Sequence, residues 1–468
     1  MATLIIVCAV PILSISVINL AYSSETARRP NIVLILADDL GYGDPGCFNA
    51  KSKILTPNLD RLAAEGMRFT DEHSAGALCT PTRYGLMTGR YPQRTTLEPA
   101  RSPCIEEGRM TVASLLADRG YQTAMIGKWH LGFDKQGWDK PFGGGPVDRG
   151  FASFFGIPLS TDLPDYYYIE GDRVVAAPSL PIAEHHSPGW SKVQGEFWRA
   201  GKIAPGMQLS EVLPNFTDRA VQIIGEAKRQ QPLFLYLAFS SPHTPWLPSA
   251  EFKGRSEASM YGDFTMMVDQ AVGRVLKALE QAGMADDTLV MFTSDNGPQW
   301  DPADIERLGH DSAGGWRGKK GQPYEGGHRM PFIARWPGKV KAGSASRQLM
   351  SHCDVMATLA AITGSELPRD AGEDSFNLLP VLLGLQSEDQ PIRETLMLST
   401  GRTIFVRQGP WKLLQTQGKI KPGEAAGELY NLADDPAEAK DLYAQHPEIV
   451  ERLTQLKDRL VSTGRSRP

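Results

Sequence analysis

The strongest constraint on the fold of this chain is a set of short, uninterrupted apolar runs, each followed at once by polar residues. The runs cover residues 31–37, 122–126, 233–239 and 288–293. An apolar run of this length without polar alternation is typical of a strand that is buried on both faces, as in a parallel sheet. The sequence therefore predicts one central sheet with a covering layer on each side.

Helical patterns lie between these runs. Thr56 and Pro57 predict the N-cap and the first residue of a helix that continues over residues 58–65. Further helices are expected over residues 110–119 and 264–282, where apolar side chains recur at helical spacing. Strands that alternate with helices predict the α/β class, here a large, doubly wound mixed sheet flanked by helices.

The pattern changes after residue 384. Residues 403–406 and 411–414 flank a Gln-Gly-Pro turn and are typical of a hairpin, and residues 448–461 are typical of a closing amphipathic helix. We therefore expect residues 25–384 to form the catalytic α/β domain. Residues 385–468 are expected to form a small C-terminal subdomain with an antiparallel sheet and a helix.

The first 24 residues differ from the rest of the chain. Residues 1–23 hold no charged side chain, residues 4–20 are mostly apolar, and small residues follow. This pattern predicts a secretory signal peptide over residues 1–24 that is cleaved on export. A retained membrane anchor is the alternative, because the run is nearly long enough to span a bilayer. We expect an exported protein with no other membrane span, periplasmic or secreted in a bacterium and lysosomal or extracellular in a eukaryote.

Composition excludes some classes of partner. Hydrophobic residues make up 41% of the 468 residues and charged residues 22%, which is ordinary for a globular protein. The formal net charge of −5 argues against nucleic-acid binding, which needs a basic face. An anionic substrate would have to be held by a local positive site, because the field of the whole molecule does not attract it.

The polar residues that follow the apolar runs are candidate site residues. Because ligands of doubly wound sheets bind beyond the carboxyl ends of the strands, these side chains are expected to meet at one rim. Each one taken alone is more simply a turn or cap residue, but four clusters on one edge indicate a site. The clusters are Asp38 with Asp39, Lys128 with His130, His243, and Asp295 with Asn296.

The most specific motif is Cys79-Thr80-Pro81-Thr82-Arg83. It resembles the Cys-x-Pro-x-Arg signature of the formylglycine-dependent sulfatases, the arylsulfatase A-like branch of the alkaline-phosphatase-like superfamily. A second family signature matches at residues 120–130. Further blocks match in the family's order at residues 30–41, 156–160, 241–243, 294–297 and 318–329. The resemblance runs from about residue 30 to residue 384 and continues weakly into the tail.

The resemblance implies that Cys79 is oxidised to Cα-formylglycine, an aldehyde that hydrates to a diol. A formylglycine-generating enzyme or an anaerobic sulfatase-maturating enzyme would act on the chain during its synthesis. The resemblance also implies a bound Ca²⁺, with Mg²⁺ as the alternative, held by residue 79 together with the aspartates and the asparagine of the rim. Carboxylate and amide oxygens are hard ligands that suit either ion. The plainer interpretation of Cys79 is a buried free cysteine.

The family's catalytic roles transfer onto matching positions of this sequence. The resemblance implies sulfate monoester hydrolysis through a sulfo-enzyme intermediate. Lys128, His243 and Lys320 correspond to the sulfate-binding groups, and His243 or Lys320 would protonate the leaving oxygen. His130 would accept a proton from the diol as sulfate is expelled, and Arg83 would orient the diol. Ser160 matches a family active-site serine, although a turn role explains it equally well.

The segment that contains Lys319, Lys320, Glu325 and Arg329 holds several charged candidates. Lys319 precedes Lys320, and we choose Lys320 because the family spacing counts back from the Tyr324–Gly327 block. Glu325 and Arg329 are more simply a structural ion pair than catalytic groups.

The substrate is less determined by the sequence. Residues 161–199 are rich in aromatic side chains that could stack on sugars or simply pack the loop, and Trp300, His310 and Trp316 lie close to the rim in sequence. Aryl and carbohydrate sulfates both fit, and the position of the sulfate, endo or exo action and the oligomeric state stay open. So does disulfide pairing among Cys47, Cys104 and Cys353.

Two other functions are compatible with parts of this pattern. A phosphonate or phosphodiester hydrolase can share the Cys-x-Pro-x-Arg nucleophile. An inactive glycan-binding homologue is expected to have lost a metal ligand, the cysteine or the Lys/His pair, and this chain keeps all of them.

Overall fold

The computed structural model describes residues 29–228, 230–419 and 426–467. The predicted signal peptide, residues 1–24, lies outside the described residues. Among the residues that are described, no helix combines the length and the apolar character that crossing a membrane requires.

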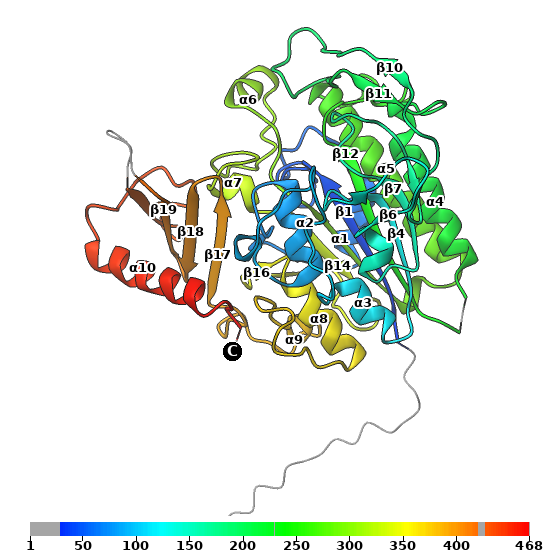
Figure 1. The fold of residues 1–468 in the computed structure, drawn as a ribbon. Helices are drawn as coiled ribbons and strands as arrows, with labels where there is room; N and C mark the ends of the chain where they lie inside the picture. Colours follow the sequence, from blue (N-terminus) through cyan, green and yellow to red (C-terminus); the bar gives the residue numbers. More distant parts are fainter. Residues whose placement is uncertain (1–28, 229, 420–425, 468) are drawn as a thin grey trace, which may run out of the picture.

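A ten-stranded mixed sheet forms the centre of the molecule (Figure 1). Its five central strands are parallel, and antiparallel strands extend it on both sides. In spatial order the strands are β15 (Ser344–Ser346), β2 (Met67–Phe69), β14 (Phe332–Arg335), β13 (Thr288–Ser294), β1 (Asn31–Asp38), β12 (Leu233–Pro242), β4 (Gln122–Lys128), β7 (Ser153–Ile157), β8 (Ile169–Glu170) and β9 (Arg173–Val174). The predicted doubly wound α/β class is confirmed.

Helices cover both faces of this sheet because its central strands are apolar on both sides. On β1, Ile32, Leu34 and Leu36 point into one hydrophobic core and Val33 and Ile35 point into the other. The first core is closed by α2 (Cys79–Thr88), α3 (Val112–Ala117), α8 (Asp354–Thr363) and α9 (Leu379–Leu382). The second is closed by α1 (Pro57–Ala64), α4 (Val212–Glu226) and α5 (Ser259–Gln281).

Shorter elements complete the main body. Two short helices are α6 (Pro302–Leu308) and α7 (Glu325–His328). Paired short strands are β3 (Glu72–His73) with β16 (Met350–Ser351), β5 (Asp134–Lys135) with β6 (Phe142–Gly143), and β10 (Leu180–Ile182) with β11 (Gly201–Ile203). Single 3₁₀ turns cover Pro92–Arg94, Pro146–Arg149, Leu209–Glu211 and Ala285–Asp287.

One sequence expectation about α1 is only partly right. Pro57 is the first helical residue and Thr56 is the N-cap position, but the Thr56 side chain makes no capping hydrogen bond. Instead, the Asp269 carboxylate of α5 accepts hydrogen bonds from the backbone amides of Asn58, at 3.1 Å, and Leu59, at 2.8 Å. A side chain 210 residues further along the chain therefore caps this helix.

The C-terminal part is an antiparallel sheet of β17 (Thr395–Thr400), β18 (Thr403–Gln408), β19 (Trp411–Thr416) and β20 (Gly427–Asn431), with α10 (Pro447–Ser462) packed on it (Figure 1). Both the expected hairpin and the closing helix are confirmed. Leu453, Leu456 and Leu460 of α10 share one core with the sheet. Among the described residues, Cys47, Cys79, Cys104 and Cys353 are all unpaired.

Candidate active site

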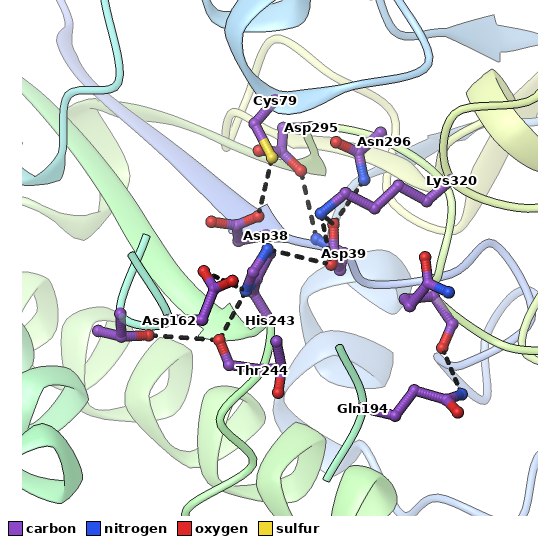
Figure 2. Close-up of polar contacts among 12 residues, drawn as sticks. Asp38, Asp39, Cys79, Asp162, Gln194, His243, Thr244, Asp295, Asn296 and Lys320 are labelled. Carbon is purple, nitrogen blue, oxygen red and sulfur yellow. Dashed lines mark hydrogen bonds and ion pairs between the residues drawn. The ribbon is translucent and has the colours of Figure 1, made fainter. Parts of the chain in front are cut away.

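The carboxyl ends of β1 and β13 place oxygen-bearing side chains next to one another (Figure 2). Asp38 ends β1, and Asp39 follows it with a φ of 64°, in the left-handed region. Asp295 and Asn296 come directly after β13. The Asp39 amide donates to Asp295 Oδ1 over 3.2 Å, and Asn296 Nδ2 donates to Asp39 Oδ1 over 2.6 Å. Because strained backbone gathers at functional sites, the conformation of Asp39 marks this edge as one.

The start of α2 brings a nucleophile position to the same edge. Cys79 is the first residue of the helix, and its Sγ donates to Asp38 Oδ1 over 3.5 Å. Arg83 lies one turn later on the same helix face. Its fully buried guanidinium donates to Asp295 Oδ2 over 2.8 Å, to Asp38 Oδ2 over 3.3 Å and to the Lys128 carbonyl over 2.8 Å.

The end of β4 adds a lysine and a histidine. Gly127 has a φ of 114°, and a Cβ there would lie 1.8 Å from the Ala238 carbonyl oxygen, so only glycine fits this close strand approach. Lys128 is fully buried, with Nζ 2.5 Å from Asp38 Oδ2. His130 follows with a φ of 56°, and its buried Nδ1 has no hydrogen-bond partner among the described residues.

Lys320 and His243 approach Asp39 from two other segments (Figure 2). Lys320 Nζ lies 2.7 Å from Asp39 Oδ1, whereas Lys319 pairs with Asp301. His243 Nδ1 donates to the Thr244 carbonyl over 2.6 Å, which leaves Nε2 facing Asp39 Oδ2 at 3.6 Å. The two lysines therefore differ in surroundings, and Lys320 is the one that faces the rim.

The donor atoms at this rim fit a hard divalent cation. Ligand atoms of Asp38, Asp39, Cys79 and His243 lie within 4.8 Å of one another. Asn296 Oδ1 is buried there and has no hydrogen-bond partner among the described residues. A buried acceptor without a donor is costly, and a cation would satisfy it. Carboxylate and amide oxygens are the ligands that Ca²⁺ and Mg²⁺ prefer.

Neighbouring cations decide the charge of Asp38. Burial by itself would raise the pKa of this carboxyl, but Lys128, His243 and Arg83 beside it hold the pKa well below its usual range. For Lys128 the balance runs the other way: burial works to lower its pKa, and the Asp38 carboxylate raises it. Asp38 is therefore ionised and Lys128 protonated at neutral pH.

The pKa values of His130 and Cys79 move in opposite directions. Burial, together with the positive charges of Lys128 and Arg83, holds the pKa of His130 well below its usual range. His130 is therefore neutral and able to accept a proton. Burial and the carboxylates of Asp295 and Asp38 raise the pKa of the Cys79 thiol. An unmodified thiol here stays protonated, which makes it a poor nucleophile.

A cavity of about 460 Å³ opens above this cluster. It is lined by Asp39, Leu78, Cys79, Thr80, Pro81, Leu97, Pro99, His130, Ser160, Asp162, Leu163, Val193, Arg199, His243, Thr244, Gln299 and Lys320. Six of the sequence-predicted residues, Ser160 among them, thus line the cavity. The other five, Asp38, Arg83, Lys128, Asp295 and Asn296, are buried at its base. The structure brings all eleven to one rim.

The aromatic residues considered from the sequence lie elsewhere. Tyr166 and Tyr167 are buried, and Trp198 stacks on His185 with ring centroids 4.4 Å apart. Trp300 and His310 are buried together, and Trp316 lines a second cavity. Among the described residues, no Phe, Tyr or Trp side chain lines the cavity at Cys79. The tyrosine and tryptophan side chains considered from the sequence therefore do not contribute to the wall of this cavity.

A sequence model of the sulfatase family matches residues 30–365. The chain belongs to the sulfatase family. A model of the C-terminal part of N-sulphoglucosamine sulphohydrolase matches residues 314–466 of this sulfatase.

Relatives and solved structures agree with this assignment. The N-acetylgalactosamine-6-O-sulfatase of Bacteroides thetaiotaomicron is 34% identical, with 93% of each chain covered. Human arylsulfatase A is 35% identical, with 94% of this chain and 89% of that protein covered. A structure solved in work on glycosaminoglycan metabolism by Bacteroides thetaiotaomicron has a TM-score of 0.82 and 31% identity, covering 93% of this sulfatase and all of that chain. The protein is therefore a sulfuric ester hydrolase.

Two residues of the cavity wall escaped the sequence reasoning. Asp162 and Arg199 belong to the aromatic-rich segment 161–199, but neither directly follows one of the four apolar runs or matches a motif. Their only sequence signal is position: they stand at the two ends of that segment, which the fold brings together.

Proposed function

We propose that this sulfatase hydrolyses sulfate monoesters with the formylglycine form of Cys79 as nucleophile, through a sulfated enzyme intermediate. The observation that carries the proposal is the meeting of Cys79, an oxygen-rich cation site and two lysines at the base of one cavity. The raised pKa of the Cys79 thiol supports it as well, because such a thiol needs chemical conversion before it can attack.

The proposed cation is Ca²⁺, with Mg²⁺ as the alternative. Asp38, Asp39, Asp295, Asn296 and residue 79 would hold it. A divalent cation there supplies positive charge that offsets the sulfate oxygens and favours the deprotonated form of a bound hydroxyl. The unpartnered Asn296 Oδ1 is the feature of this chain that best supports its presence.

The proposed roles of the side chains follow from where they lie. Lys128, Lys320 and His243 bind the sulfate and stabilise the negative charge that grows on its oxygens. His243 or Lys320 gives a proton to the leaving alcohol. Arg83 fixes the position of residue 79, because its guanidinium ties α2 to Asp38 and Asp295.

His130 acts in the second half of the reaction. Its neutral imidazole, with an unpartnered Nδ1, is suited to take a proton from residue 79 as inorganic sulfate leaves. Ser160 lines the cavity with its side chain nearly buried, and we propose that it contacts the substrate.

A carbohydrate sulfate is the proposed substrate class, with a 6-O-sulfated N-acetylgalactosamine as the first compound to test. The name of the Bacteroides thetaiotaomicron relative, which covers 93% of this chain, supports that choice. An aryl sulfate is the alternative, supported by the similarity to human arylsulfatase A.

The organisation and setting of the protein are also proposals. Residues 1–24 act as the signal peptide, residues 25–384 form the catalytic domain and residues 385–468 form the C-terminal subdomain. The exported protein is periplasmic or secreted, and a formylglycine-generating or anaerobic sulfatase-maturating enzyme converts Cys79 beforehand.

Sulfate release tests the proposal. The full chain, co-produced with a formylglycine-generating enzyme, is incubated with N-acetylgalactosamine 6-sulfate and with phenyl sulfate, and inorganic sulfate is measured. We expect release from at least one compound and none from the Cys79→Ala variant. Faster hydrolysis of a phenyl phosphonate monoester than of either sulfate would contradict the proposal and favour the phosphonate hydrolase alternative.

A further inference from the structure

An arginine and an aspartate from opposite ends of one long segment meet in the wall of the cavity. Asp162 follows β7 closely, and Arg199 comes shortly before β11, yet the two side chains form an ion pair and both line the cavity above Cys79. The Asp162 side chain is only 6% exposed, whereas that of Arg199 is 36% exposed. The carboxylate is therefore the buried anchor, and the guanidinium is the part that reaches the cavity.

Arg199 is held firmly in this position. Its Nη1 donates to the Asp162 carboxylate and to the Asp162 carbonyl, the latter over 3.2 Å. Its backbone amide donates to the same carbonyl over 3.3 Å, and Tyr166 Oη donates to the Arg199 carbonyl over 2.8 Å. The Phe197 ring lies under the guanidinium, 4.9 Å from ring centroid to Cζ. Little side-chain entropy is left to lose when a ligand binds.

One edge of the guanidinium remains available. Both side-chain hydrogen bonds of Arg199 use Nη1, and Nε and Nη2 have no hydrogen-bond acceptor among the described residues. These two nitrogens present N–H donors in the fixed fork geometry of arginine. A ligand that offers two neighbouring oxygens would match them.

Much of the cavity lining outside the catalytic cluster is apolar. Leu78, Leu97, Pro99, Leu163 and Val193 line the cavity together with Arg199. A leaving group that fits must therefore combine an apolar face with oxygen acceptors at one edge. A sugar ring does so, since its C–H bonds form the faces and its oxygens lie around the rim. Because Asp162 already balances the charge of Arg199, the site favours neutral hydroxyl or amide oxygens over a second anion.

We propose that Arg199, anchored by Asp162, recognises the sugar that carries the sulfate and so selects saccharide sulfates over aryl sulfates. The proposal rests on the sulfatase activity proposed above. Arg199 binds the leaving group and takes no part in the chemistry at residue 79.

The test compares phenyl sulfate with three sugar sulfates across two matched variants. Arg199→Gln removes the charged fork. Arg219→Gln is the control, because Arg219 has a side chain 37% exposed, pairs with Glu170 and lies over the Phe155 ring, but does not line the cavity. Phenyl sulfate offers no oxygen beyond its sulfate ester. The 6-sulfates of N-acetylgalactosamine, galactose and N-acetylglucosamine also carry the hydroxyl or amide oxygens that Arg199 would bind.

We expect Arg199→Gln to lower kcat/KM for the preferred sugar sulfate about 10- to 100-fold, the loss typical of a charged hydrogen bond, mainly through KM. Its kcat/KM on phenyl sulfate should stay close to that of the wild type, and Arg219→Gln should change neither substrate. Melting temperatures of the two variants show whether each is folded.

Other outcomes would overturn the proposal. An equal loss on both substrates would assign Arg199 to the catalytic centre or to the fold, and no loss on either would remove it from recognition. A wild-type enzyme that hydrolyses phenyl sulfate but none of the sugar sulfates would refute sugar recognition and leave the sulfatase activity intact. Failure on every substrate, with formylglycine present, would refute the proposed activity itself.

Discussion

His130 shows how surroundings at the residue scale shape chemistry. It stands in the left-handed region, partly exposed in the cavity wall and beside two permanent cations, and its Nδ1 has no partner among the described residues. Burial and the nearby charges of Lys128 and Arg83 keep the imidazole neutral by lowering its pKa. A neutral imidazole with a free nitrogen is a base, which fits a step late in turnover rather than initial sulfate binding.

The His130→Asn variant tests this assignment. Asparagine tolerates left-handed backbone, so the fold is expected to survive, but it cannot accept the proton. We expect kcat to fall about 10²- to 10⁴-fold, the usual contribution of a general base. Because the blocked step is release of sulfate, the sulfated enzyme should accumulate and be detectable by intact mass spectrometry. A slow variant without accumulated sulfated enzyme would place His130 in the first step instead.

At the scale of elements, α7 joins the segment that carries Lys320 to the four-stranded C-terminal sheet. Lys412 of β19 is fully buried, with Nζ 3.0 Å from Glu325 Oε1 and 2.8 Å from Glu438 Oε1. The same Nζ lies 3.0 Å from His328 Nε2. His73, Glu325 and His328 have the spacing of a metal site, but the ammonium group already supplies the cation. The cluster therefore fastens the segment that carries Lys320 to the four-stranded C-terminal sheet.

Lys412→Met is expected to weaken this connection. The change leaves Glu325 and Glu438 buried without their shared cation, and breaking a buried ion pair typically costs about 3–5 kcal/mol. Urea unfolding of the variant and the wild type measures the difference. Arg407→Met is the comparison. Arg407 lies on β18 of the same sheet as Lys412 and pairs with Asp71, but its side chain is partly exposed. Its replacement should therefore lower the free energy of unfolding by less. A loss below about 1 kcal/mol for Lys412→Met would contradict the role given to the cluster.

At the scale of the whole molecule, the sequence was most informative where the signal is local. Apolar runs predicted the central strands, and the polar residues directly after them predicted the rim residues that the structure brings together. Contacts between distant segments carried no such signal. Three features could not be predicted, because each depends on packing between segments that are far apart in sequence. They are the Asp269 cap on α1, the pairing of Asp162 with Arg199 and the burial of Lys412.

Buried histidines also make the free energy of unfolding of the whole molecule depend on pH. Burial lowers the pKa of His352 from 6.5 to about 3, and it lowers the pKa of His73 and His328 as well. The unfolded chain therefore binds more protons at these three histidines than the folded chain does once the pH falls below 6.5, and the folded state loses stability as the pH falls. For His352 this loss extends down to about pH 3.

A His352→Gln variant isolates this effect. The free energy of unfolding of the wild type should fall relative to that of the variant as the pH drops from 6.5, by up to about 1.4 kcal/mol per pH unit. Denaturant titrations at a series of pH values measure the difference. A constant difference across that window would show that His352 is not held neutral by burial.

The most direct test of the whole account is mass spectrometry of the peptide that contains residue 79, taken from protein isolated from its own organism. We expect Cα-formylglycine or its hydrate at that position and, in the same preparation, release of inorganic sulfate from a sulfate ester. An unmodified cysteine there, in protein that still releases sulfate at an undiminished rate, would contradict it.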